Sequence, residues 1–503
     1  MGRGGLRSDG RKKIPVGASL WRYHRLESNV PVQGWFEVGE HMLRSRWSDL
    51  GLKFANTLTI GAVLAGAFLV VPASAESKAR IVRLSEVQGT VQIDRSGRDG
   101  FGKAFINLPV IEGSRVKTGN DGRAEVEFED GSTLRLVPGT QIDFVRLSLG
   151  DDGNKLNTVH LDSGMVYANV HLKKARDKSG DQFLLNFANE SVTVPEAAHF
   201  RLQLDAANKA TLAVFKGKCS AILPSAQFDI PEKHSATISF AQNDGSGNDD
   251  SAKSKDTFVM AKKYESAPAD AWDRQQADYH DRNASTTASA RLSSPYAYGM
   301  SDLNYYGNFM NVAGYGNVWQ PYFVGSNWSP FQDGAWAFYP GAGYMWVSGY
   351  PWGWMPYRYG NWAFMSGIGW FWQPGFANSY YAFPQVLNAP AAAKIPVAPA
   401  TGRQTVMVGR GLSANPPADT MRVLTINPGS AGFGVPRGSI DHLNHIAKKV
   451  DHTSRPAIVA TAPPISTAPS TGFGMTPLSP TAAANQGAMG VSHHPTSTST
   501  RPH

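Results

Sequence analysis

The stretch AEVEFEDGSTLRLV, residues 124–137, predicts two short antiparallel strands joined by a tight turn. Val126 and Phe128 alternate with glutamates, so one face of the first strand is apolar and the other is acidic. Asp130 and Gly131 suit the positive backbone dihedral angles of a tight hairpin, and the alternation resumes after them. Period-2 patterning on both sides of Asp-Gly is a strong hairpin signal.

The acidic face of the first strand carries Glu125, Glu127 and Glu129. Such a row can bind a cation, but we interpret it as a solvated strand face, because antiparallel sheets commonly have one face in water. Three histidines nearby lack metal-ligand spacing and are interpreted as surface or hydrogen-bonded side chains: His160, His171 and His199. The sequence therefore predicts no metal site here.

The same pattern of short alternating segments and turn residues continues over residues 80–241. Short alternating segments separated by glycines predict further strands at 81–84, 87–94, 141–147, 158–161 and 165–171. Turn signals about 8–12 residues apart are typical of an all-β sandwich, roll or barrel. We therefore expect a mainly β protein that begins with such a domain.

This region resembles the FecR domain, which is named for a periplasmic regulator of iron-citrate uptake. The resemblance rests on VQGTVQI, NLPVIEGSRVKTGNDGRAEVEFEDGSTLRLVPGTQI and LDSGMVYANV, all within residues 81–171. The matching positions are Gly89, Gly113, Gly122-Arg123-Ala124, Asp130-Gly131-Ser132 and Gly164. The resemblance implies a β domain that makes protein contacts outside the membrane. Signalling members of the family carry a cytoplasmic sigma-factor-binding domain and a membrane helix before this domain, and this sequence departs from that order.

An export signal precedes the β domain. Residues 58–71, LTIGAVLAGAFLVV, form an apolar run of fourteen. A membrane-spanning helix needs about 20 such residues, whereas a secretory signal needs about 7–15. Small residues at 73–75 predict cleavage after Ala75. We therefore expect a signal peptide over 42–75, a mis-annotated extension over 1–41, and a periplasmic or extracellular mature protein with no stable membrane span; an uncleaved anchor is the alternative.

Residues 242–300 are predicted to be a linker with a short helix. The first part is polar and rich in Gly and Ser, as in flexible linkers. A helix is expected at about 256–282, broken near Pro268. Trp272 and Tyr279 share one face of it, seven residues apart. We expect this helix to pack on a neighbouring module.

A Trp/Tyr/Gly-rich β module is predicted over residues 301–375, where nine of the thirteen Trp lie between positions 319 and 372. Pairs of aromatic residues alternate with Gly or Pro turns, which predicts five to seven very short strands. The stretch YPWGW, residues 350–354, resembles the Tyr-x-Trp-Gly-x-Trp repeats of exported bacterial proteins. That resemblance implies no particular activity.

Two interpretations of the aromatic rings remain open. In one, the large rings form the core of the module, because its strands are too short to build an aliphatic core. In the other, some rings form an exposed platform that stacks on a glycan or a peptide. The candidate platform residues are Trp352, Trp354, Tyr357, Tyr359 and Trp362, which we expect to be at least partly exposed.

The C-terminal part is predicted to be mostly linker and tail. Residues 376–450 are expected to be a linker with short strands at 404–408 and 421–426, followed by a helix over 440–450. Ser439 is the expected cap of that helix. From residue 451 to 503, Pro, Ser, Thr and Ala dominate, and we expect disorder.

Composition narrows the function. The single Cys219 excludes an intramolecular disulfide and a multi-cysteine metal site. Residues 1–75 supply +5 of the net charge of +8, and no basic stripe predicts nucleic-acid binding. No converging acid, base or nucleophile set and no cofactor motif is visible, so we expect no enzyme.

We therefore expect a non-catalytic exported FecR-domain protein of the bacterial envelope, which senses or scaffolds through contacts with an envelope protein. The alternative is a carbohydrate- or peptidoglycan-binding protein that holds a cell-wall glycan on the aromatic module. A hydrolase whose site the sequence does not reveal is a third hypothesis.

Overall fold

A computed structural model describes residues 80–95, 100–172, 180–205, 208–240, 257–284, 298–375, 380–412 and 421–461. All of them belong to one compact unit of the chain, Glu76–His503. The N-terminal extension and the signal peptide predicted over 1–75 lie outside the described residues. Among the helices that the structure describes, none is long and apolar enough to cross a membrane.

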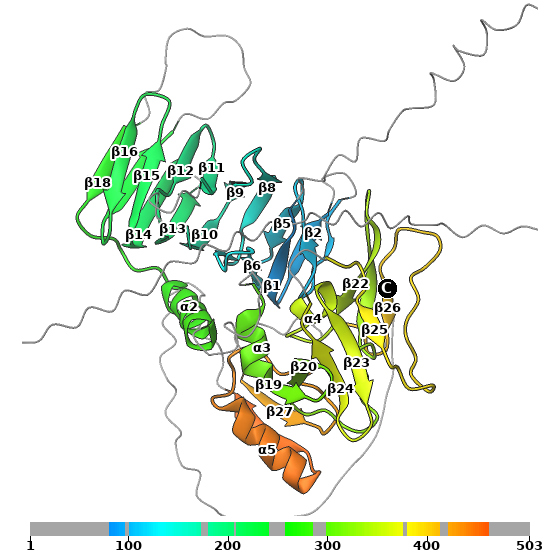
Figure 1. Cartoon of the computed structure of the whole chain (residues 1–503). Helices are drawn as coiled ribbons and strands as arrows, with labels where there is room; N and C mark the ends of the chain where they lie inside the picture. Colours follow the sequence, from blue (N-terminus) through cyan, green and yellow to red (C-terminus); the bar gives the residue numbers. More distant parts are fainter. Residues whose placement is uncertain are drawn as a thin grey trace, which may run out of the picture. The chain divides into compact units, whose positions relative to one another are not determined.

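The N-terminal part is a β-sandwich of two nine-stranded sheets (Figure 1). In spatial order, the first sheet contains β18 (Thr257–Ala261), β17 (Ser235–Ser239), β14 (Lys209–Lys216), β13 (Ala198–Asp205), β10 (Met165–Val170), β7 (Thr133–Leu136), β6 (Arg123–Glu127), β1 (Val82–Gln88) and β4 (Pro109–Val110). The second contains β16 (Gln227–Pro231), β15 (Lys218–Ile222), β12 (Glu190–Thr193), β11 (Gln182–Phe187), β9 (Lys155–Ser163), β8 (Gln141–Leu149), β5 (Arg115–Thr118), β2 (Val91–Asp94) and β3 (Gly102–Lys103). Apolar side chains of both sheets share one core, which confirms the predicted mainly β fold.

The hairpin predicted at Asp130-Gly131 joins β6 to β7, which pair antiparallel. Gly131 has a φ of +85°, a conformation that glycine adopts without strain. The Asp130 carboxylate accepts a hydrogen bond from the Ser132 amide at 2.9 Å. Val126 and Leu134 are cross-strand partners and point into the sandwich core. Asp130 does not share the positive φ expected of it, so local alternation predicted the hairpin correctly and the turn prediction holds for Gly131 alone.

The helix predicted over 256–282 is wrong in its first part. Residues 257–261 form strand β18, which pairs antiparallel with β17 at the edge of the first sheet. β-Branched and aromatic residues favour a strand there, and pairing with β17 satisfies backbone groups that would otherwise need water. The helix begins after Pro268 as α2 (Asp270–Ala284). Its Trp272 is buried against the first sheet, as expected for a helix that packs on a neighbouring module.

The aromatic region forms two small sheets and two short helices. The five-stranded sheet contains, in spatial order, β19 (Gly307–Val312), β20 (Gly316–Pro321), β24 (Gly369–Gln373), β23 (Asn361–Met365) and β25 (Gln385–Leu387). The three-stranded sheet contains β22 (Gly343–Ser348), β21 (Gly334–Tyr339) and β26 (Val406–Val408). The helices are α3 (Met300–Tyr306) and α4 (Met355–Arg358). Their rings form a second, largely aromatic core.

The C-terminal segment contributes to that core. It contains β27 (Arg422–Ile426), α5 (Leu443–Thr453) and β28 (Ala457–Thr461), and β27 pairs antiparallel with β28. Ala431 and Leu443 are buried among the aromatic rings. The segment predicted to be a linker therefore also supplies one wall of a core.

Two further predictions for this segment need correction. The residue at the N-cap of α5 is His442, with a φ of +54° and no side-chain cap, whereas the Ser439 hydroxyl donates to the Pro436 carbonyl. Disorder from residue 451 onward is wrong for 451–461, because pairing with β27 orders β28. Residues 462–503 lie outside the described part of the chain.

Candidate functional site

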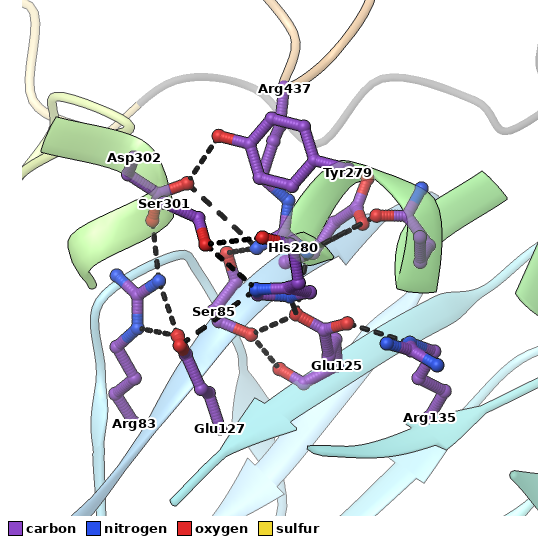
Figure 2. A network of polar contacts seen from close by, with 12 residues as sticks. Arg83, Ser85, Glu125, Glu127, Arg135, Tyr279, His280, Ser301, Asp302 and Arg437 are labelled. Carbon is purple, nitrogen blue, oxygen red and sulfur yellow. Dashed lines mark hydrogen bonds and ion pairs between the residues drawn. The ribbon is translucent and has the colours of Figure 1, made fainter. Parts of the chain in front are cut away.

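The outer face of the first sheet is charged and buried. Glu125, Glu127 and Glu129 are 0%, 1% and 6% exposed, so the interpretation of this row as a solvated strand face is wrong. Residues of α2 and α3 and a loop that carries Arg437 cover the strand (Figure 2). These covering segments bury the three carboxylates. Each carboxylate then requires a charged partner, because an unpaired buried charge is costly.

Arg83 of β1 joins the sheet to α3. Its Nε donates to Glu127 Oε2 at 2.7 Å, and its Nη2 donates to Asp302. Asp302 also accepts a hydrogen bond from the Tyr279 hydroxyl of α2 at 2.8 Å. Burial alone would lower the pKa of Arg83, but Glu127 and Asp302 raise it. The two helices and two strands are thus connected through the ion pairs of Arg83 and the hydrogen bond of Tyr279.

Glu125 is the centre of the network in Figure 2. Arg135 Nε donates to it at 2.7 Å and Arg437 Nη2 at 2.6 Å. His280 Nε2 lies 2.9 Å from Glu125 Oε1. Burial would raise the pKa of Glu125, but Arg437, His280 and Arg135 together hold it well below its usual range. The Glu125 carboxylate is therefore held by Arg135, Arg437 and His280 on both of its oxygens.

Arg437 brings the C-terminal segment to the same place. Its Nη2 also lies 3.2 Å from Glu86 Oε2 and 3.2 Å from Gln276 Oε1. Its guanidinium carbon lies 5.0 Å from the centroid of the Tyr279 ring, within the range of a cation–π contact. One side chain therefore holds the C-terminal segment, α2 and the β-sandwich together.

The chemistry of this network favours a structural role. In the part of the chain that the structure describes, no group of three or more His, Cys, Asp or Glu is placed to hold a metal ion. The acids and bases that converge here are paired with one another and buried. Buried ion pairs add little net stability because desolvation offsets attraction, but losing one partner is costly. The network therefore fixes how the modules are joined.

The five rings predicted to form an exposed platform are buried. Trp352, Trp354, Tyr357 and Trp362 are 0% exposed and Tyr359 is 4% exposed, so the prediction of exposure is wrong. The strands of this module are too short for a layered aliphatic core, and the rings take its place. A ligand-binding role for these five rings stays a prediction.

Contacts of these rings show a packed interior. Trp352 stacks on Tyr350 with ring centroids 4.9 Å apart and an interplanar angle of 14°. The Trp352 indole N–H donates to the carbonyl of Ala431 at 2.7 Å. The hydroxyls of Tyr359 and Tyr298 are hydrogen-bonded at 2.6 Å. Ala431 belongs to the segment that sequence patterns suggested was a linker, so its contribution was missed.

A cleft of about 650 Å³ opens at another part of the aromatic module. Four rings line it: Trp328, Phe331, Phe364 and Trp370. Pro/Ala-rich residues between 390 and 396 also line the cleft, and Gln332 and Lys394 supply polar groups. None of the five predicted platform residues lines this cleft. The sequence showed that aromatic residues are abundant but gave no signal for which of them border a cleft.

Two parts of the chain match known families. Residues 114–220 match the family described as FecR protein, which confirms the resemblance seen in the sequence. Residues 300–401 match a family described as being of unknown function, DUF6600. No curated protein matches the chain.

Solved structures also match part of it. Two are crystal structures of a candidate anti-sigma factor from Parabacteroides distasonis ATCC 8503, with 14% and 13% identity. Each match covers 30% of this chain and 59% of the other chain, with a TM-score of 0.23. The chain thus spans little more than half the length of these proteins.

Proposed function

We propose that this chain is a non-catalytic exported protein of the bacterial envelope, in which a FecR-type domain senses or scaffolds through protein contacts. The observation that carries the proposal is the match of residues 114–220 to the FecR family. The buried network supports it, because it joins that domain to the aromatic module through groups that are unavailable for acid–base chemistry. Burial also raises the pKa of the Cys219 thiol, which disfavours a nucleophilic role.

Exposed aliphatic side chains offer surfaces for such contacts. Met421, Val423 and Ile458 are 70%, 69% and 75% exposed on or next to the two-stranded sheet β27–β28. Val259 and Met260 are exposed on the edge strand β18. Large apolar groups gathered on one surface are typical of interaction sites.

The test combines location and contact in the native bacterium. N-terminal sequencing of the envelope fraction is expected to give a mature chain that starts at Glu76. A photo-crosslinking residue at Val423 should then form a discrete adduct with an envelope protein, and one at the exposed Lys449 of α5 serves as the matched control. A chain that stays in the cytoplasm, or equal labelling from both positions, would contradict the proposal.

The aromatic cleft favours a second candidate function, the binding of a cell-wall glycan. Phe364 is the partly exposed ring of the cleft and can pack on the apolar face of a sugar, above a floor of the nearly buried Trp328, Phe331 and Trp370, and the amide of Gln332 can bind sugar hydroxyls. Titration of the mature chain with peptidoglycan fragments should change its Trp fluorescence, and replacing the partly exposed ring in Phe364→Ala should abolish binding. Tyr344→Ala, outside the cleft, is the control. An unchanged fluorescence signal and no heat of binding would eliminate this candidate.

A further inference from the structure

The beginning of α2 fits a pocket on the outer face of β7, β10 and β13. The indole of Trp272 is fully buried and packs with Val137 and Tyr167. The guanidinium carbon of Arg123 lies 5.4 Å from the centroid of the indole ring. The pocket therefore accepts an aromatic ring beneath a cation, a favourable arrangement when desolvated.

Two carboxylates, three positions apart on α2, flank this indole. The Asp270 carboxylate accepts hydrogen bonds from the Tyr167 hydroxyl at 2.7 Å and from Arg201 Nη1 at 2.5 Å. The Asp273 carboxylate accepts one from Arg135 Nη1 at 2.7 Å.

His199 lies on the other side of Asp273, with its Nε2 2.7 Å from Oδ2. Burial would raise the pKa of Asp273, but Arg135 and His199 lower it. The outer face of β7, β10 and β13 thus carries cations and hydrogen-bond donors on both sides of an aromatic pocket. This arrangement is complementary to the Asp-x-Trp-Asp sequence at positions 270–273.

The fit of α2 leaves donors unused. Arg135 Nη2, Arg201 Nε and the indole nitrogen of Trp272 are buried and have no hydrogen-bond partner within the described residues. A buried donor without a hydrogen-bond partner destabilises the packing around it. A helix that offered an additional acceptor near Arg135 or Arg201 would therefore suit this face better than α2 does.

We propose that the outer face of β7, β10 and β13 is a recognition site for a helix of a partner protein that places a Trp between two carboxylates, and that α2 occupies this site as an internal competitor. The inference rests on the proposed function, since it names one surface through which protein contacts are made. Its argument is charge complementarity: three buried arginines of the sheet face the acidic end of the helix.

The chain connection makes α2 a strong competitor. Residues 262–269 link β18 to α2 and are largely exposed. A ligand held by so short a link has an effective concentration in the millimolar range. A partner helix is therefore expected to bind the wild-type chain weakly, and much more strongly once the contacts of α2 are weakened.

The experiment uses the full mature chain and a fluorescein-labelled synthetic peptide of residues 266–284. Fluorescence anisotropy measures peptide binding to the wild type, to the double variant Asp270→Asn/Asp273→Asn, and to Asp278→Asn, which changes an exposed carboxylate of the same helix. The double variant should bind the peptide about 100-fold more tightly than the wild type, because neutralising both carboxylates weakens the contacts of α2 with Tyr167, Arg201, Arg135 and His199. Asp278→Asn should behave as the wild type.

One further protein variant and one modified peptide test whether the peptide is recognised specifically or binds because the fold is loosened. Adding Arg135→Gln to the double variant should abolish peptide binding, and a peptide with both carboxylates amidated should not bind. If the double variant lacks a cooperative unfolding transition, Trp272→Ala releases α2 while keeping both carboxylates and takes its place.

Three results would overturn the inference. The first is that the double variant, or Trp272→Ala in its place, folds but binds the peptide no better than the wild type. The second is that the amidated peptide binds as tightly as the unmodified peptide. The third is that the wild type forms a stable dimer that exchanges α2 between copies. These assays need only purified chain and peptide. Their failure therefore leaves the envelope crosslinking result unaffected, and failure to find an envelope partner leaves the peptide result standing.

Discussion

The substitution Arg437→Ala removes a cation shared by several carboxylates of the buried network. The side chain of Arg437 is 3% exposed, and it pairs with Glu125 and Glu86. Glu125 retains Arg135, whereas Glu86 keeps no other ion pair among the described residues. The variant therefore leaves the buried Glu86 carboxylate with a hydrogen bond from Gln88 but no ion pair, and it detaches the loop that carries Arg437.

The magnitude follows from these contacts. Removing one partner of a buried ion pair costs about 3–5 kcal/mol. Burial raises the pKa of Glu86, and only part of this is offset by Arg437, so Glu86 can take up a proton in the variant and limit the penalty. We therefore expect a loss near the lower limit, about 3 kcal/mol. With a shift of about 2 °C per kcal/mol for a chain of this size, Tm should fall by about 6 °C.

Urea unfolding followed by circular dichroism measures the loss at pH 7 and at pH 4. Arg455→Ala, an exposed arginine of the same C-terminal segment, is the matched control and should change stability by less than about 0.5 kcal/mol. Glu86→Gln in the Arg437→Ala background should recover part of the loss. Protonation at pH 4 should narrow the difference from the wild type. A loss at pH 7 no greater than that of the control would refute the reasoning.

Other outcomes follow from the same structure. Because the folded-state pKa values of Glu125 and Asp273 are lowered, their stabilisation is complete above the unfolded values, about 4.3 and 3.9, and is lost as pH falls through the folded values. The urea midpoint should therefore decline below about pH 4, and a midpoint that stays constant to pH 3 would contradict this. Cys219 is buried and its pKa is raised, so a thiol reagent should react with it only after unfolding; rapid labelling of the native chain would show otherwise. Trp352→Ala should cost about 3–5 kcal/mol in a urea titration, because it removes a fully buried ring, whereas a cost below 1 kcal/mol would mean that the ring is not part of the core.

The sequence predicted elements whose signals are local. The hairpin of β6 and β7 follows from alternation and Asp-Gly, and both lie within one stretch of the chain. Burial of the outer face of β6 depends instead on distant segments, since Glu125 and His280 are 155 positions apart. Alternation along a strand predicts one apolar and one polar face, but it does not predict whether other segments cover the polar face.

One signal for the covered face was present but ambiguous. Glu125 is the cross-strand partner of Arg135, and Arg83 is that of Glu127, so opposite charges face each other across neighbouring strands. Solvated sheets show the same pairing. The additional information lies on α2, where the Asp-x-Trp-Asp pattern combines an indole with two acids at the spacing of one helical turn.

The aromatic module shows why residue density alone does not identify a ligand platform. Short strands joined by Gly and Pro turns must bury large rings to form any core, so a high density of Trp is required for folding before it serves binding. The rings most central to the dense stretch, such as Trp352 and Trp354, are therefore the most completely buried. Trp328 and Trp370 line the cleft but are themselves only 4% and 3% exposed, and of the four lining rings Phe364 alone is partly exposed, beside residues 390–396. Access to a ligand is thus set by how the following Pro/Ala segment packs, a long-range property that counting aromatic residues does not reveal.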